Sequence, residues 1–122
     1  MLNKHILIIE DEAEFAALLK MRLEANKFHV TIASNGEKGL QQIKASVPNL
    51  ILLDVMMPGI DGYEVLRRLR REPATRHTPI IMLTAKGESK SIFKAQDLGA
   101  TDYLIKPCES TELLVIGRKY LH

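Results

Sequence analysis

The chain has 122 residues, of which 46% are hydrophobic, and its formal net charge of +2 is too small by itself to imply binding to nucleic acid. This length fits one domain, residues 1–122, and the single Cys108 excludes an internal disulfide, while the lack of a Cys/His cluster excludes a structural zinc site. No apolar run reaches the roughly 20 residues that span a bilayer, and the start of the chain lacks a secretory signal, so we expect a cytoplasmic protein without a membrane partner.

Short apolar runs alternate along the chain with segments whose apolar residues recur at helical spacing. Apolar runs of this length, bounded by turn residues, predict buried strands. The strands are expected at Ile6–Ile9, Phe28–Ala33, Leu50–Leu53, Ile80–Leu83 and Tyr103–Ile105. The helices are expected over about Glu12–Ala25, after Asn35 and Gly36, around Leu66 and Leu69, around Ile92, Phe93 and Leu98, and from Leu113 to Leu121. This alternation predicts an α/β fold with a parallel sheet covered on both faces.

Four of these runs stop at residues capable of chemistry. In an open α/β sheet, ligands bind outside the carboxyl ends of the strands, and parallel strands bring those ends to one edge. We therefore expect the residues at the four ends to converge. They are the acidic pair Glu10 and Asp11, the carboxylate Asp54, the hydroxyl of Thr84 and the ammonium of Lys106.

The three carboxylates predict a cation site. Asp54 alone would be typical of a turn or helix cap. Glu10 and Asp11 beside it would repel one another and Asp54 unless a cation lay between them. Mg²⁺ binds oxygen ligands, usually one or two carboxylates together with phosphate oxygens and water. The pattern therefore favours magnesium, although one acid after the first strand could also complement the dipole of the following helix.

Thr84 and Lys106 complete a set suited to phosphoryl transfer. That reaction needs in-line positioning, and it needs cations and hydrogen-bond donors around the phosphoryl oxygens. Taken singly, Thr84 is typical of a strand end and Lys106 of a surface charge. A cis bond between Lys106 and Pro107 would fix the direction of the ammonium.

Together these residues resemble a response-regulator receiver domain of two-component signalling, of the chemotaxis-regulator type. The resemblance covers essentially the whole chain. It rests on the acidic pair, Leu53–Gly59, Leu83–Ala85 and Asp102–Pro107. It implies a flavodoxin-like, doubly wound, five-stranded parallel sheet with strand order 2-1-3-4-5, flanked by five helices.

The resemblance also implies a role for each site residue. Asp54 would accept a phosphoryl group from a histidine kinase, from a histidine phosphotransfer protein or from a small phosphodonor. Asp11 and Asp54 would bind Mg²⁺ through their carboxylates and Met56 through its backbone carbonyl, with Glu10 in the outer shell. Glu10 stands where an aspartate is common in the family. The groups that would contact the phosphoryl oxygens are Thr84 and Lys106.

Phosphorylation would act as a switch through Thr84 and Tyr103. In receivers, movement of the hydroxyl toward the phosphoryl group makes room for the aromatic side chain. The face formed by the fourth helix, the fifth strand and the fifth helix then changes its binding preference. The expected partners are an output protein or domain and a second copy of the chain, without direct contact to nucleic acid. The chain would catalyse only its own phosphorylation and dephosphorylation, so we do not expect an enzyme with a separate substrate.

Two other classes of protein fit the sequence less well. A phosphohydrolase of the haloacid-dehalogenase type needs an aspartate two residues after its nucleophile, and Met56 occupies that position. A flavin carrier needs a phosphate loop rich in serine and threonine after the first strand, where Glu10, Asp11 and Glu12 would repel a phosphate. The sequence leaves open whether the receiver stands alone or belongs to a larger regulator or a hybrid kinase.

The remaining features have simpler interpretations. Cys108 is expected to be a small buried apolar residue. Gly117 lowers the stability of the last helix by roughly 1 kcal/mol relative to alanine, and Val115 on that helix is expected to be exposed and to face a partner or a continuation of the chain. Arg67–Arg71 is expected to be a solvated helix face. The four histidines lie far apart in sequence and receive no role: His5, His29, His77 and His122.

Overall fold

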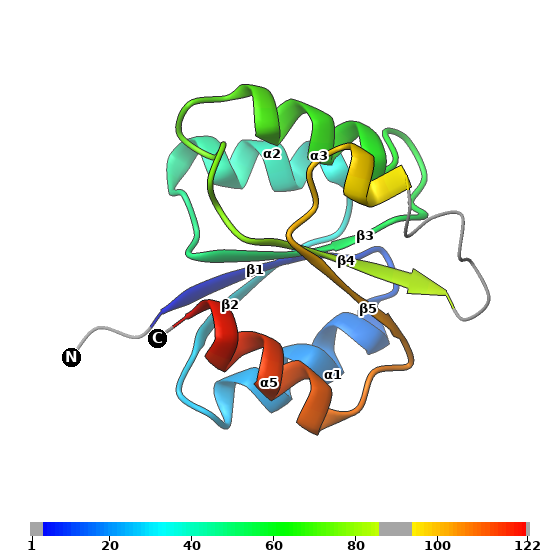
Figure 1. Ribbon diagram of the computed structural model, residues 1–122. Coiled ribbons are helices and arrows are strands. Elements are labelled where there is room, and N and C mark those ends of the chain that lie inside the picture. Colours follow the sequence, from blue (N-terminus) through cyan, green and yellow to red (C-terminus); the bar gives the residue numbers. More distant parts are fainter. Residues whose placement is uncertain (1–3, 86–93, 122) are drawn as a thin grey trace.

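A computed structural model describes residues 4–85 and 94–121, and at its centre lies a parallel sheet of five strands (Figure 1). The strands are β1 (His5–Ile9), β2 (His29–Ala33), β3 (Leu50–Asp54), β4 (Ile80–Ala85) and β5 (Asp102–Lys106). Their order is β2-β1-β3-β4-β5, which confirms the predicted doubly wound topology. The chain reverses direction of winding at β1, so the carboxyl ends of β1 and β3 border the crevice where such sheets bind ligands.

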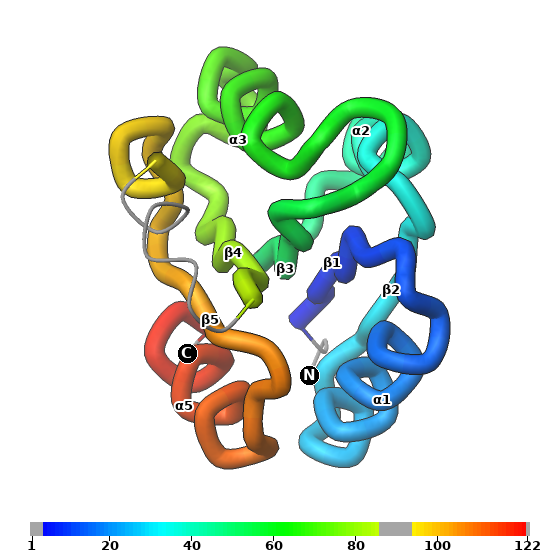
Figure 2. Tube along the Cα trace, turned by 90° about the vertical axis from the view of Figure 1, so that its right-hand side faces the viewer, coloured from blue at the N-terminus to red at the C-terminus, as the bar shows by residue number. Residues whose placement is uncertain are grey.

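Helices cover both faces of the sheet. Helices α1 (Ala13–Glu24) and α5 (Ser110–Tyr120) lie on one face, and α2 (Gly36–Ala45) and α3 (Gly62–Arg71) lie on the other (Figures 1 and 2). Residues 94–97 are also helical and lie on the side of α2 and α3. They form the end of the predicted fourth helix, whose expected apolar positions Ile92 and Phe93 lie outside the described residues.

The sheet has a core on each side because successive side chains of a strand point to opposite faces. In β1, Ile6 and Ile8 belong to the cluster packed under α1 and α5. Leu7 and Ile9 belong to the cluster packed under α2 and α3. Burial on both faces explains why the strands read as continuous apolar runs rather than as alternating patterns.

The connection from β3 to α3 shapes one side of the candidate site. Gly59 adopts a φ of +80°, a left-handed conformation that favours glycine, just after Pro58. Asp61 then caps α3, with its Oδ1 accepting a hydrogen bond from the Glu64 amide at 2.9 Å. The chain therefore turns sharply after Asp54 and returns along the sheet as α3.

Several smaller expectations about the carboxyl-terminal part are confirmed. The Lys106–Pro107 peptide bond is cis. Cys108 is buried, and burial raises the pKa of its thiol. Val115 on α5 is 60% exposed, whereas Gly117 on the same helix is buried near the ring of Phe28.

Within the described parts of the chain, no helix is long and apolar enough to cross a membrane.

Candidate functional site

The carboxyl edge of the sheet brings together the groups predicted from the sequence. Asp54 is the last residue of β3, and Lys106 is the last residue of β5. Thr84 lies between them near the end of β4, where its register partner in β5 is Ile105. Glu10 directly follows β1, and its amide donates a hydrogen bond to the Ala33 carbonyl at 3.0 Å. Residues from four segments of the chain thus meet at one edge.

Lys106 joins the two buried carboxylates of the site. Its Nζ lies 2.7 Å from Glu10 Oε1 and 3.1 Å from Asp54 Oδ1. Burial by itself would lower the pKa of the Lys106 ammonium, yet its contacts with Glu10 and Asp54 raise that pKa above the ordinary value. The lysine is therefore a fixed positive charge between two acids.

Asp54 is buried in surroundings that disfavour its charge. Only 3% of the residue is exposed. Burial and the neighbouring charge of Glu10 raise the pKa of the Asp54 carboxyl to about 7, and the contact with Lys106 opposes that rise only in part. The site therefore carries more negative charge than the lysine balances, and an additional cation would favour the ionised form of Asp54.

The three predicted acidic residues form one cluster. Carboxylate oxygens of Glu10, Asp11 and Asp54 all lie within 4.8 Å of one another. Glu10 and Asp54 are buried, while Asp11 is exposed at the mouth of the site. Hard divalent cations such as Mg²⁺ take oxygen ligands of this kind and retain several waters, which the open side at Asp11 would admit. The donor set therefore fits Mg²⁺.

Thr84 presents an unsatisfied hydroxyl to the same edge. The residue is 1% exposed, and its Oγ1 has no hydrogen-bond partner among residues 4–85 and 94–121. Leaving a buried hydroxyl unpaired costs about 1–3 kcal/mol. Such a group is suited to donate to a ligand oxygen that enters the site.

Three features of the site escaped the sequence analysis. The Lys106 ammonium lies 5.1 Å from the centre of the Phe15 ring in α1, a cation–π contact from a residue that reads only as an apolar helix position. The Glu12 amide donates to Glu10 Oε2 at 3.0 Å and so fixes the buried carboxylate. At Gly62, any Cβ would collide with the backbone carbonyl oxygen of Asp54. Of these three features, only the one at Gly62 could have been found from the sequence, because a glycine often marks a place where two backbone segments approach closely.

Tyr103 and its neighbours define the face that the resemblance associates with switching. Tyr103 lies on β5 and is 37% exposed, and Ile105 two residues later is 40% exposed. Asp102 is tied to α5, because its Oδ2 accepts a hydrogen bond from the Tyr120 hydroxyl at 2.8 Å. Tyr103 and Ile105 are therefore exposed on β5, and Val115 is exposed on α5.

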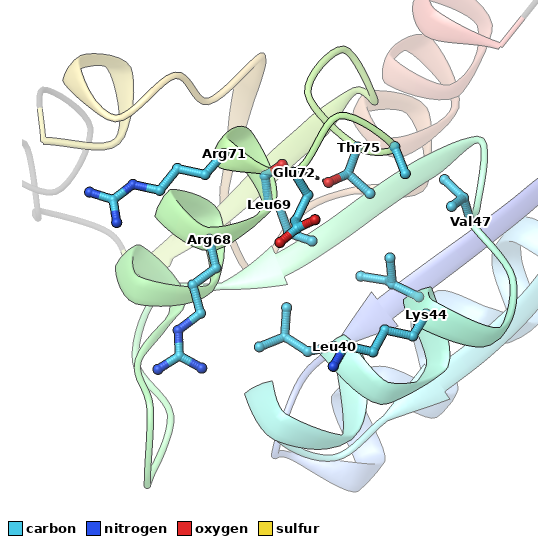
Figure 3. Close-up of a pocket in the computed structure, with 10 residues that line it drawn as sticks. Leu40, Lys44, Val47, Arg68, Leu69, Arg71, Glu72 and Thr75 are labelled. Carbon is cyan, nitrogen blue, oxygen red and sulfur yellow. Dashed lines mark hydrogen bonds between the residues drawn. The ribbon is translucent and has the colours of Figure 1, made fainter.

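A cavity of about 410 Å³ lies between α2 and α3, away from the carboxylates (Figure 3). Its apolar walls include Leu40 and Leu69, and charged side chains such as Lys44 and Glu72 reach its rim. None of the site residues predicted from the sequence lines this cavity. This cavity is therefore separate from the polar site at the sheet edge.

A doubly wound sheet with a cluster of three carboxylates, a lysine and an unpaired hydroxyl at its carboxyl edge is typical of phosphate-handling α/β domains. The chain matches the family model described as the response regulator receiver domain over residues 6–117. The protein therefore belongs to the response regulator receiver domain family, and the resemblance inferred from its sequence is confirmed.

Known relatives support the same assignment. YkoG of Bacillus subtilis, an uncharacterized transcriptional regulatory protein, is 46% identical over 110 residues, which make up 90% of this chain and 47% of YkoG. A crystal structure of a response regulator from Chloroflexus aurantiacus is similar with a TM-score of 0.95, 38% identity and 98% coverage of both chains. The signal receiver domain of a histidine kinase from Syntrophus aciditrophicus has a TM-score of 0.90 and 32% identity, with 97% of this chain and 89% of that chain covered. The chain spans about half the length of the curated relatives it matches.

Proposed function

We propose that residues 1–122 form one receiver domain in which Asp54 accepts a phosphoryl group. The donor would be the phosphohistidine of a histidine kinase or of a histidine phosphotransfer protein. The observation that carries this proposal is the position of Asp54, buried at the carboxyl edge with its Oδ1 3.1 Å from Lys106 Nζ and its carboxylate beside those of Glu10 and Asp11. Membership of the family supports the same role.

The proposed cofactor is Mg²⁺. The carboxylates of Asp11 and Asp54 and the backbone carbonyl of Met56 would hold the ion, with Glu10 in its outer shell. The clustering of three carboxylates within 4.8 Å, against the ammonium of Lys106, supports this assignment. When bound, Mg²⁺ would supply positive charge to the phosphoryl oxygens as they develop charge.

The residues of the chain position the reacting groups. An oxygen of Asp54 forms a bond to phosphorus as the bond from phosphorus to the donor nitrogen breaks. Lys106 already contacts this carboxylate, so its ammonium is placed to contact an oxygen of the transferred group. The unpaired hydroxyl of Thr84 donates to another such oxygen. The chain would thus catalyse its own phosphorylation and dephosphorylation without acting on a separate substrate.

Phosphorylation would change the surface around Tyr103. The transferred group brings a charge of roughly −1.5 to −2 and three strong acceptor oxygens. Movement of the Thr84 hydroxyl toward it would open space for the Tyr103 ring, and the exposed face of β5, α5 and the fourth helix would then favour a partner. An output protein or domain, or a second copy of the chain, would bind there.

We do not expect this domain to bind nucleic acid directly. The arginines of α3 are largely engaged within the domain, since Arg67 and Arg68 pair with Glu64. Arg70 donates hydrogen bonds to four backbone carbonyl groups, one of which is that of Gly99 at 2.7 Å. Such a surface offers few unpaired cations to phosphates.

Incubation with acetyl phosphate and Mg²⁺, followed by intact mass spectrometry, tests the proposed function. We expect one phosphoryl adduct that requires Mg²⁺ and is absent in Asp54→Asn. The matched control is Asp61→Asn, because asparagine also caps helices well and this variant should retain the adduct. An adduct of equal yield in Asp54→Asn, or none in the parent protein, would overturn the assignment.

A further inference from the structure

The first two strands place two histidines side by side at the amino edge of the sheet, opposite the edge that carries Asp54. His5 and His29 are register partners in the parallel β1–β2 pair, so their side chains point to the same face. Their ring centres lie 4.9 Å apart, with 36° between the ring planes. The two histidines are far apart in the sequence, so their proximity could not be predicted without the strand register.

The separation of the rings matches that of two imidazoles on one metal ion. A zinc–nitrogen bond of about 2.0–2.1 Å puts each ring centre about 3.2 Å from the ion. Two ligands at a tetrahedral angle then have ring centres about 5.2 Å apart, and at a right angle about 4.5 Å apart. The observed 4.9 Å lies between these values.

His5 also has the supporting contact that metal-bound histidines show. Its Nε2 lies 2.8 Å from Thr31 Oγ1, on the same face of β2. When Nε2 carries the proton and donates it to this hydroxyl, the lone pair of the ring is on Nδ1. A hydrogen bond from the ring nitrogen that does not bind the metal normally orients a ligating histidine. The His5 amide is in turn held by Asn49 Oδ1 at 2.8 Å, which fixes the start of β1.

The pair is accessible to a metal ion. His29 is exposed, so an ion can reach the pair from solvent.

We propose that His5 and His29 form a bidentate site for a divalent transition metal ion that prefers imidazole ligands, such as Zn²⁺, Ni²⁺ or Cu²⁺, with water completing the coordination. Mg²⁺ prefers oxygen ligands, so it would select the carboxylates at the opposite edge. An ion bound at the histidine pair would link β1 to the edge strand β2.

Nickel titration followed by ¹⁵N–¹H NMR, with Mg²⁺ saturating the carboxylates, locates the site. Paramagnetic Ni²⁺ broadens resonances of nearby amides, so we expect broadening centred on residues 5 and 29–31. The broadening should disappear in His29→Gln and in His5→Gln. It should persist in His77→Gln, a matched control at an exposed histidine.

Zinc titration of thermal unfolding under the same conditions provides a second readout. We expect Zn²⁺ to raise the unfolding temperature of the parent and of His77→Gln, with no rise in His29→Gln. Thr31→Val should weaken zinc affinity about tenfold, since it removes the contact that orients His5. Broadening centred only on residues 10, 11 and 54, or equal zinc stabilisation in His29→Gln, would overturn the proposal. Phosphorylation by acetyl phosphate should be unchanged in His29→Gln, so failure of this site is distinguishable from failure of the receiver function.

Discussion

Asp54 occupies surroundings that favour its protonated form in the metal-free protein. Its pKa is raised from an ordinary 3.8 to about 7, first by burial and then by the charge of Glu10. Between these two pH values the folded protein holds a proton that the unfolded chain releases. The free energy of unfolding therefore decreases as the pH rises from 3.8 to about 7.

Removing the Asp54 carboxyl should therefore stabilise the protein at high pH. Without Mg²⁺ at pH 8, Asp54→Asn should raise the free energy of unfolding by about 1–3 kcal/mol, because it removes a buried charge that Lys106 balances only in part. At pH 5 the gain should shrink, since Asp54 is then protonated in the folded parent. Urea unfolding at both pH values measures the difference. An Asp54→Asn protein less stable than the parent at pH 8 would contradict this account, and Asp61→Asn should show no comparable pH-dependent gain.

Thr84 permits a prediction that separates stability from switching. Its hydroxyl is buried without a partner among the described residues, so Thr84→Val should raise the free energy of unfolding by about 1–3 kcal/mol, because it removes that unpaired group. Asp54 should still accept a phosphoryl group, but the phosphorylation-dependent shift of the Tyr103 amide resonance should be lost. A shift of parental size in Thr84→Val would show that the hydroxyl does not couple the site to Tyr103.

The sequence predicted which residues meet at the site, but not how they contact one another. Carboxyl ends of parallel strands must converge, so Asp54, Thr84 and Lys106 could be placed at one edge from their positions alone. The contacts of Lys106 with both buried acids depend on side-chain directions, which the chain order does not specify. The pairing of His5 with His29 depends on strand register and was missed for the same reason.

The connection between β3 and α3 fixes Asp54 through its backbone. A Cβ at Gly62 would collide with the Asp54 carbonyl oxygen and approach Val55 Cα to 2.9 Å. Backbone atoms cannot yield as a flexible side chain can. The glycine therefore lets the helix start directly against the strand end that presents the carboxylate.

Gly62→Ala should accordingly lower the free energy of unfolding by about 1–3 kcal/mol or more and should slow phosphorylation. The matched control is Gly117→Ala in α5, where a Cβ would lie 3.3 Å from the Phe28 ring. There, the tight contact opposes a gain of about 1 kcal/mol in helix propensity, so the net change should be within about 1 kcal/mol. Urea unfolding of both variants checks this contrast, and equal stability changes would refute the role given to Gly62.

Strands and helices were predictable because each buries its apolar residues with its own period. The run Leu50–Leu53 indicated a strand covered on both faces, and the structure places β3 at the centre of the sheet. The ends of the elements were predicted less exactly. Glu12 was expected to begin the first helix, because an acidic residue suits a first helical turn, but α1 begins at Ala13. Helix ends depend on backbone geometry at one or two residues, which periodicity does not encode.

At the scale of the whole molecule, the surface of β5 and α5, on which Tyr103, Ile105 and Val115 are exposed, suggests where the domain meets a partner. We expect phosphorylation to promote self-association through this surface and Val115→Glu to prevent it, because a charge would have to be buried in the contact. Light scattering after gel filtration, with and without phosphodonor and Mg²⁺, measures the change. Val47→Glu, at a residue 44% exposed beside the cavity between α2 and α3, is the matched control. A parent protein that stays monomeric in both conditions would contradict this expectation.

We propose that Asp54 itself forms an acyl phosphate, and chemical trapping can detect this bond. Borohydride reduces an aspartyl phosphate to homoserine, which peptide mass spectrometry can assign to a position. After treatment with acetyl phosphate and Mg²⁺, we expect homoserine at position 54 and unchanged aspartates at positions 11 and 61. Homoserine at another position, or unmodified Asp54 in a protein that carries a phosphoryl group, would contradict it.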